Sequence, residues 1–222
     1  MTNTTSFTLR YFPVAARAET CKALLFFIGA EWVLEAPEWP REKGAQRVGK
    51  LPVLIEHSAS ETEEPFVLGD SRAIEEYLAT KYSLYYQPDD AQLMARQREL
   101  RAHMHDIYEL SAMIIHAPEL ARPFFTSKYL ALARCVVDTH ERVLKENGSN
   151  GHYFGNSTTY LDIAALAGLL TFRKTFAHLV PELLVPLDKT NAPETNNAVE
   201  ILSKDPAFAS YISALETCSN AE

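Results

Sequence analysis

The chain has 222 residues and a formal net charge of −8. A chain of this length forms one large domain or two small ones, and it buries a core without needing a disulfide or a metal. The excess of acidic residues argues against nucleic acid as a partner, because no basic stripe is available to offset phosphates. It also disfavours an anionic membrane surface.

The three cysteines, Cys21, Cys135 and Cys218, lie far apart and form no C-x-x-C pair. Their spacing gives no support to a metal site, so we expect none. The first twelve residues lack a basic segment followed by an apolar one, and no apolar run is long enough to span a bilayer. We therefore expect a cytoplasmic protein without a signal peptide or a membrane partner.

The first part of the chain, residues 1–83, mixes strand and helix patterns. The predicted elements are a strand over 7–12, a helix over 15–29, a strand over 32–34, strands over 51–56 and 65–70, and a helix from Ser71. Alternating apolar and aromatic residues indicate the strands, and apolar residues at helical spacing indicate the helices. The order is β-α-β followed by β-β-α, which is typical of a small α/β domain.

The composition changes at residues 84–90, which we interpret as a linker. The predicted elements after it are helices over 89–117, 125–147, 159–176, 195–203 and 206–216. Residues 91–222 are therefore expected to form a second, all-α domain.

Two features of the α/β part suggest a ligand site. Leu51-Pro52 begins a strand, where the peptide bond is either an ordinary trans bond or a cis bond that turns the preceding backbone groups outward. Asp70-Ser71 stands where a strand meets a helix, so Ser71 is either a plain N-cap or part of an anion site. Each feature has a structural explanation when it is taken alone.

The order of these features resembles the thioredoxin-like domain of the cytosolic glutathione transferases. The segment from Tyr11 to Glu19, YFPVAARAE, is similar to the Y-F-x-x-R-G-R-A-E stretch of the sigma class, which includes glutathione-dependent prostaglandin isomerases. Trp39-Pro40 with Lys43, followed by G-K-L-P at 49–52, has the spacing of that class. The T-x-x-D sequence at 159–162 resembles the capping box that opens the buried helix of the superfamily.

The resemblance implies that glutathione is the co-substrate and that Tyr11 is the catalytic residue. Its hydroxyl would donate a hydrogen bond to the glutathione sulfur and keep it ionised, because a free thiol has a pKa of about 8.5. Without the other motifs, a tyrosine in this predicted strand is better explained by packing in a core.

The resemblance also implies a set of glutathione-binding residues: Tyr11, Trp39, Lys43, Lys50, Leu51, Pro52, Asp70 and Ser71. Trp39 and Lys43 would meet the glycine carboxylate, whereas Lys50 is explained more simply as a solvated lysine. The backbone of Leu51 would pair with the cysteinyl unit, as in strand addition. Asp70 and Ser71 would hold the γ-glutamyl end, and Arg17 is expected to be structural.

The chain departs from the sigma pattern at Ala15 and Ala16, at Asp70, and in a hairpin tip around Glu61 to Glu64 that is longer than usual. Ala15 and Ala16 stand where the family has an arginine and a glycine, and Asp70 stands where it has a glutamine or glutamate. The missing arginine removes a cation near the sulfur. The shorter Asp70 side chain would contact the γ-glutamyl amine less closely.

The second substrate would bind in a pocket formed by the loop after the first strand and by the first helix of the all-α domain. The candidates are Phe12, Val14, His105, Tyr108 and Met113. Family members also borrow an acidic residue from a partner subunit, and Asp106 is the candidate in this chain. The resemblance thus implies a homodimer.

These motifs favour an enzyme that conjugates glutathione to small hydrophobic electrophiles in detoxification. A glutathione-dependent isomerase or peroxidase remains an alternative, because the electrophile site has no transferable motif. A non-catalytic ligand-binding or structural protein of the same fold is the third hypothesis. The retained Tyr11 argues against it.

Overall fold

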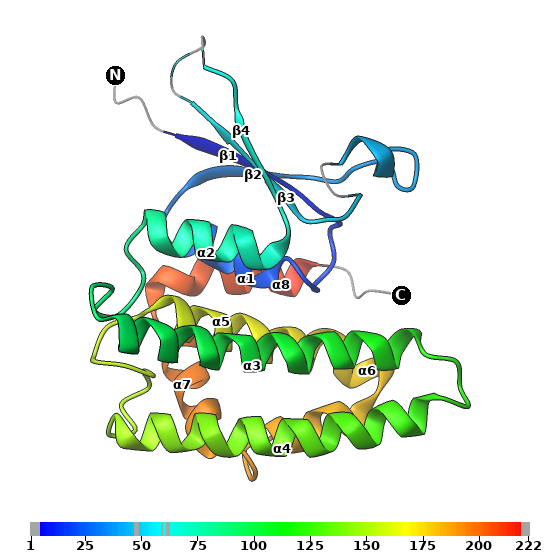
Figure 1. Ribbon diagram of the computed structural model, residues 1–222, viewed down its shortest axis with the longest axis vertical. Coiled ribbons are helices and arrows are strands. Elements are labelled where there is room, and N and C mark those ends of the chain that lie inside the picture. Colours follow the sequence, from blue (N-terminus) through cyan, green and yellow to red (C-terminus); the bar gives the residue numbers. More distant parts are fainter. Residues whose placement is uncertain (1–4, 47–48, 59, 61–62, 219–222) are drawn as a thin grey trace. The chain divides into compact units, whose positions relative to one another are not determined.

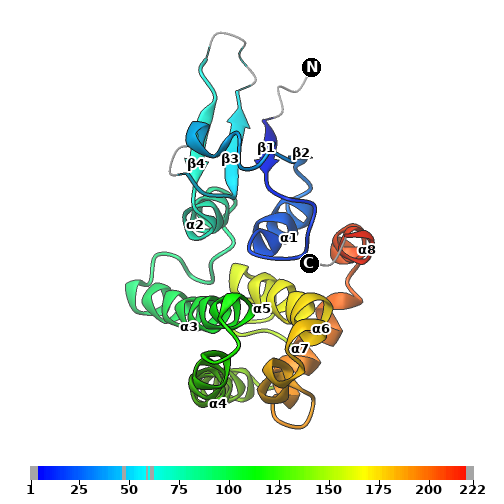
Figure 2. The same ribbon diagram turned by 90° about the vertical axis from the view of Figure 1, so that its right-hand side faces the viewer.

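The computed structural model describes residues 5–46, 49–58, 60 and 63–218. The chain forms two compact units (Figures 1 and 2). Unit 1 consists of Met1–Ser83 and Pro206–Glu222, and unit 2 consists of Leu84–Asp205. Among the described helices, none is long and apolar enough to cross a membrane.

Unit 1 contains a four-stranded sheet. Its elements are β1 (Ser6–Arg10), α1 (Glu19–Phe27), β2 (Glu31–Glu35), β3 (Val53–His57), β4 (Phe66–Gly69) and α2 (Ser71–Lys81). The strand order is β2-β1-β3-β4, with β1 parallel to β2 and antiparallel to β3. The parallel pair requires a crossover, which α1 provides. The predicted β-α-β, β-β-α order is confirmed.

The helices α1 and α2 cover one face of this sheet (Figures 1 and 2). Both helices bury an apolar stripe, and so do the strands that they cover. The fully buried side chains include Phe7, Leu9, Leu24, Leu25, Leu54, Ile74 and Leu78. Burying such side chains is the main source of stability for this unit.

Helix α1 begins at Glu19, four residues later than the sequence predicts. The backbone N–H of Arg17 donates to the hydroxyl of Tyr11 instead of to a helical carbonyl. The N–H of Lys22 donates to the carbonyl of Ala18, which is the first carbonyl of the α-helical series. Residues 13–18 therefore form a turn between β1 and α1, and Gly29, at φ 61°, follows the end of the helix.

The last helix belongs to unit 1. A short 3-10 helix, η4 (Pro206–Phe208), leads into α8 (Ala209–Thr217), and both pack on α1. The ring of Phe208 stacks on Phe27 with centroids 5.2 Å apart. The sequence prediction placed this segment in the all-α domain. Helical periodicity shows that a segment has an apolar face, but it does not show which element covers that face.

Unit 2 is helical. Its elements are α3 (Ala91–His116), α4 (Arg122–Glu146), α5 (Tyr160–Thr171), η2 (Phe172–Phe176), α6 (Ala177–Leu179), η3 (Pro181–Leu187) and α7 (Pro193–Ser203). Helices α3 and α4 form a long hairpin (Figure 1). Helix α5 is buried almost completely. The helix predicted over 159–176 ends at Thr171 and continues as the π-helical turn η2. The α/β and all-α classes of the two regions are confirmed.

The capping box at the start of α5 is present. One carboxylate oxygen of Asp162 accepts from the backbone N–H and the hydroxyl of Thr159, each at 2.7 Å. The other accepts from the backbone N–H of Tyr153 at 2.8 Å. Asp162 is only 1% exposed, so its carboxylate satisfies donors that water does not reach.

We expect Asp162→Ala to lower the free energy of unfolding by about 3 kcal/mol, because three donors lose a buried charged acceptor. The measurement is urea denaturation. The control is Asp90→Ala, which removes the exposed N-cap of α3 and costs about 1 kcal/mol. If the two variants lose the same free energy of unfolding, the buried carboxylate of Asp162 stabilises the protein no more than an exposed N-cap does.

Candidate functional site

The register of the sheet brings four strand ends together. Arg10 at the end of β1 is opposite Val53 at the start of β3, and Val53 is opposite Gly69 at the end of β4. The residues one step beyond these three are Tyr11, Pro52 and Asp70. Adjacent strands lie about 4.8 Å apart, so the three positions lie within about 10 Å of one another across the sheet. The parallel strand β2 ends at the same edge, opposite Arg10.

Tyr11 is almost buried, with 7% of its surface exposed. Its hydroxyl accepts a hydrogen bond from the backbone N–H of Arg17 at 3.2 Å. Burial raises the pKa of Tyr11 to about 12, although the backbone bond and the positive charge of Arg17 oppose this shift. The phenol is therefore protonated at neutral pH, so it can donate a hydrogen bond to an anion but does not serve as a base.

The loop after β2 carries Trp39 and Lys43. The ring of Phe12 meets that of Trp39 edge to face with centroids 5.9 Å apart, and Phe12 lies 5.6 Å from the ring of Tyr11. The Lys43 ammonium lies 5.8 Å from the centre of the Trp39 ring, at the start of the 3-10 helix η1 (Lys43–Ala45). Trp39 is 37% exposed. An aromatic side chain and a cation thus stand at the surface beside Tyr11.

Arg10 holds this loop to the sheet, and the sequence analysis missed it. Its guanidinium forms ion pairs with Glu35 at 2.9 Å and with Glu42 at 2.6 Å, and it donates to the side chain of Gln46 at 3.5 Å. Glu42 and Gln46 lie in the loop, whereas Glu35 ends β2. Arg10 is the charged residue at a polar position of the alternating first strand, immediately before Tyr11. A charged residue at this position was the available sign of a role near the site. The sequence alone does not show which residues Arg10 contacts.

The segment before β3 contains Leu51 and Pro52, two of the predicted ligand-binding residues. Leu51-Pro52 is a cis peptide bond, as is Trp39-Pro40. The paired register of β3 starts at Val53, so Leu51 lies beyond the ladder and is half-buried. Pro52 is buried and Lys50 is exposed. The backbone of Leu51 is thus the part of this segment that an extended ligand can pair with.

Asp70, and not Ser71, caps α2. The Asp70 carboxylate accepts from the backbone N–H groups of Arg72 at 2.9 Å and Ala73 at 3.3 Å, and its backbone has a positive φ of 79°. Ser71 is the first helical residue and is 4% exposed, and its carbonyl accepts from the thiol of Cys21. The N-terminus of α2 therefore lies at the edge of the sheet where Tyr11 and Pro52 lie.

The remaining candidates are divided between the two units. Val14 lies half-buried in the turn after Tyr11, and its carbonyl accepts from Lys22. In α3, Tyr108 packs against the ring of Phe176 at 5.6 Å, and Met113 is 50% exposed. His105 is half-buried and Asp106 is exposed on the same helix. An electrophile pocket that uses residues of both units remains a prediction, as does the role of Asp106.

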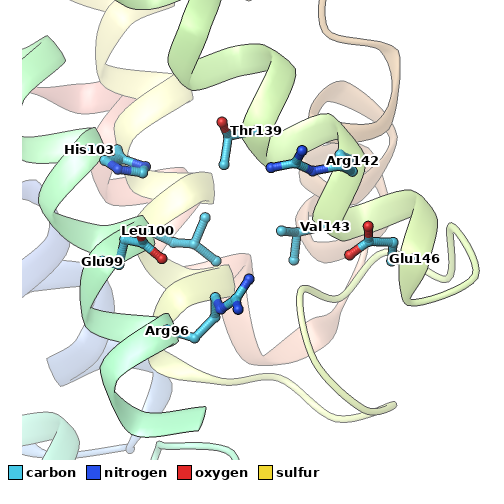
Figure 3. A pocket seen from close by; sticks show the side chains of 8 residues that line it. All are labelled: Arg96, Glu99, Leu100, His103, Thr139, Arg142, Val143 and Glu146. Atoms are coloured by element: carbon cyan, nitrogen blue, oxygen red, sulfur yellow. The ribbon is translucent and has the colours of Figure 1, made fainter. Parts of the chain in front are cut away.

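A groove of about 430 Å³ lies between α3 and α4 in unit 2 (Figure 3). Its lining residues are Arg96, Glu99, Leu100, His103, Thr139, Arg142, Val143 and Glu146. In the part of the chain that the structure describes, no ion pair involves either arginine or either glutamate of this groove. Nor do the described residues contain a group of three or more His, Cys, Asp or Glu side chains placed to hold a metal ion.

Comparisons with known proteins agree with this architecture. No protein-family model matches the sequence. The probable glutathione S-transferase 6 of Caenorhabditis elegans is 26% identical over 187 residues, which cover 77% of this chain and 87% of the relative.

Three solved structures share the fold over nearly the whole chain. A sigma class GST of Fasciola hepatica has a TM-score of 0.75 at 19% identity and covers 98% of each chain. NaGST-2 has a TM-score of 0.71 at 20% identity and covers 98% of each chain. Prostaglandin synthase D of Nilaparvata lugens has a TM-score of 0.72 at 16% identity, covering 94% of this chain and 97% of that protein.

The resemblance first seen in the motifs is thereby confirmed. The chain is similar in sequence to a probable glutathione S-transferase and in fold to solved glutathione transferases. Its predicted enzyme class, glutathione transferase, rests on the same findings.

We expect Arg10→Met to release the loop that carries Trp39 and Lys43, because Glu42 and Gln46 lose their common partner. Amide hydrogen exchange of residues 38–46, measured by mass spectrometry, should become faster. The matched control is Arg41→Met, which removes only the exposed ion pair with Glu38 and should leave exchange nearly unchanged. Unchanged exchange in Arg10→Met would contradict the anchoring role.

Proposed function

We propose that this protein conjugates the thiolate of glutathione to small hydrophobic electrophiles, as a detoxifying glutathione transferase. The observation that carries this proposal is the buried, protonated hydroxyl of Tyr11 at the meeting point of the strand ends. A hydroxyl that stays protonated can stabilise an adjacent thiolate by donating to it, and such a charge-assisted bond is stronger than a neutral one.

The surroundings of Tyr11 suit a tripeptide with charges at both ends. On one side, the indole of Trp39 and the ammonium of Lys43 would meet the glycine carboxylate, with Lys50 as a further cation nearby. On the other side, the N-terminus of α2 with Ser71 would hold the γ-glutamyl carboxylate, since helix N-termini favour anions. The backbone of Leu51, before the cis Pro52, would pair with the cysteinyl unit between them.

The two carboxylate oxygens of Asp70 would make different contacts when glutathione is bound. One carboxylate oxygen caps α2, and the other would meet the γ-glutamyl amine. Because the aspartate is shorter than the glutamate or glutamine that the family usually has, its contact with the γ-glutamyl amine would be less close.

The reaction needs few steps once glutathione is bound. The thiol loses its proton to solvent, and the Tyr11 hydroxyl stabilises the resulting thiolate. The sulfur then forms a bond to the electrophilic carbon, and the leaving group departs with its electron pair. Lowering the thiol pKa by one unit requires about 1.4 kcal/mol of preferential thiolate stabilisation, which one charge-assisted hydrogen bond supplies.

The proposed class is sigma. The support is the Y-F-x-x-x-x-R-A-E sequence at 11–19 and the similarity to a sigma class GST fold. Ala15, which is fully buried, stands at the position where that class has an arginine. The positive charge closest to Tyr11 in the turn comes from Arg17, whose guanidinium lowers the pKa of the phenol.

Tyr11→Phe tests the proposal. We expect the rate of conjugation to an aryl halide to fall roughly 10- to 100-fold at neutral pH, because one charge-assisted hydrogen bond to the thiolate is lost. The loss should shrink as the pH rises above about 8.5, where the thiol ionises without help. Calorimetric binding of glutathione should remain nearly intact. Tyr82→Phe is the control for the removal of a hydroxyl in unit 1.

The outcomes separate the alternatives. If the parent protein and Tyr11→Phe both bind glutathione but conjugate it equally slowly, Tyr11 is not catalytic. That result would favour a non-catalytic ligand-binding protein. Binding with slow conjugation but rapid isomerisation or reduction of a lipid peroxide, both sensitive to Tyr11→Phe, would favour the isomerase or peroxidase. If the protein does not bind glutathione, the proposed function is wrong and only the assignment of the fold remains.

We also propose that the protein is a homodimer and that the groove between α3 and α4 contributes to the contact. Arg96 and Glu99 project from α3 toward Arg142 and Glu146 on α4 (Figure 3). All four side chains are exposed, yet no ion pair joins them to each other within the described residues. In a two-fold contact the arginines of one copy can face the glutamates of the other, so this set of charges is self-complementary.

Charge reversal tests this contact. We expect Arg96→Glu with Arg142→Glu to give a monomer in sedimentation velocity, because like charges then face each other across the two-fold axis. Glu99→Arg with Glu146→Arg should also give a monomer, and mixing the two variants should restore a dimer. Lys128→Glu with Arg134→Glu, on α4 outside the groove, is the control. A monomeric parent protein, or a mixture that stays monomeric, would contradict the proposal.

A cytoplasmic location completes the proposal. Cys21, Cys135 and Cys218 are free thiols in the described structure, and Cys135 is exposed on α4. A reducing compartment keeps such thiols reduced.

A further inference from the structure

A buried ion pair lies close to the ring of Tyr11. Glu19 and Lys22, in the first turns of α1, are 2% and 4% exposed, and their charged atoms are 2.6 Å apart. Removing two charges from water is costly, and a buried ion pair often stabilises a protein no better than apolar residues of the same size. Stability alone is therefore a weak reason for this pair, and its other contacts indicate a different role.

Lys22 connects the pair to the turn that holds Tyr11. Its ammonium donates to the backbone carbonyl of Val14 at 3.2 Å and lies 5.9 Å from the centre of the Tyr11 ring. Val14 belongs to the turn over residues 13–18, whose Arg17 N–H donates to the Tyr11 hydroxyl. A cation that holds the carbonyl near the start of this turn thus restrains the segment whose Arg17 N–H donates to the hydroxyl.

Glu19 connects the pair to the last helix. Its second carboxylate oxygen accepts from the hydroxyl of Tyr211 at 3.3 Å. Tyr211 lies on α8, is 1% exposed, and packs its ring against Phe26 with centroids 6.1 Å apart. Tyr211, Glu19, Lys22 and Val14 therefore form a continuous chain of polar contacts inside unit 1, from the last helix to the turn after β1.

We propose that Tyr211, Glu19 and Lys22 are positioning residues that hold the 13–18 turn and thereby aim the Tyr11 hydroxyl at the sulfur. The proposal rests on the proposed function for its catalytic consequence, whereas its structural part concerns the ligand-free protein. The ionisable side chains near the Tyr11 phenol are those of Arg17, Glu19, Cys21 and Lys22. The last helix then belongs to the catalytic machinery, although it is almost two hundred residues away in sequence.

The first test is Tyr211→Phe, which deletes one hydroxyl and keeps the ring that packs on Phe26. The matched control is Tyr129→Phe in unit 2, where a fully buried hydroxyl donates to the carbonyl of Leu183 at 2.6 Å. Both variants lose one buried tyrosine hydroxyl. Only Tyr211→Phe should disturb the turn.

The first readout needs no substrate. In the ligand-free protein we expect amide hydrogen exchange at Arg17, followed by NMR, to become about ten-fold faster in Tyr211→Phe and to stay unchanged in Tyr129→Phe. The second readout is catalytic. In Tyr211→Phe, kcat at neutral pH should fall about ten-fold with little change in the KM for glutathione, and the pH profile of kcat should move to higher pH.

A double variant and a single variant test the role of the two charged residues, Glu19 and Lys22. Glu19→Gln with Lys22→Met replaces the ion pair by neutral side chains of similar size, so neither charge is left buried and unpaired. It should reproduce the catalytic loss and the shifted pH profile. Lys22→Arg keeps a cation that should reach both Glu19 and Val14, and this variant should retain most of the parent's activity.

Two results would overturn the inference. One is an unchanged Arg17 exchange rate in both Tyr211→Phe and the double variant. The other is a lower melting temperature together with an unchanged pH profile of kcat. That result would mean that the network only stabilises the fold. If the parent protein fails to turn over glutathione but Arg17 exchange responds as expected, the proposed function fails and the positioning network stands.

Discussion

The pairing register of one short strand, β3, determines the geometry of the candidate site. Val53 is opposite Arg10 on one side and Gly69 on the other. This register places Tyr11, Pro52 and Asp70 at one edge of the sheet. A shift of β3 by one residue would reverse its inward and outward faces and remove Leu54 from the core, so the buried face prevents it. The packing that stabilises the sheet therefore also places the chemical groups.

Two kinds of local anchoring refine this arrangement. Arg10 ties the loop that carries Trp39 and Lys43 to the end of β1 through Glu35 and Glu42. The turn after Tyr11 is held by the Arg17 N–H on one side and by the buried Lys22 on the other. Charged residues thus restrain irregular backbone around the site, where regular hydrogen bonding is absent. A site that is preorganised in this way loses less conformational entropy when a ligand binds.

The protonation state of Tyr11 follows from the same packing. Burial raises the pKa of the phenol to about 12, and the nearby Arg17 only partly opposes it. A phenol in this environment remains a donor over the neutral range. An exposed tyrosine would also be protonated there, but water would compete for its hydrogen bond. Burial therefore matters less for the charge of Tyr11 than for the strength and direction of the bond that it donates.

The sequence by itself determined the fold class and the order of elements, because strand alternation, helical spacing and the Thr159–Asp162 cap are local signals. Its resemblance to the glutathione transferases also predicted Tyr11, Trp39, Leu51-Pro52 and Ser71 as one set of site residues. The tertiary structure alone decided that α1 starts at Glu19, that Asp70 caps α2, and that the last helix packs on α1. It alone joined Arg10 to Glu42 and Tyr211 to Glu19. The reason is physical: side chains far apart in sequence meet through packing and long-range hydrogen bonds, which leave no local pattern.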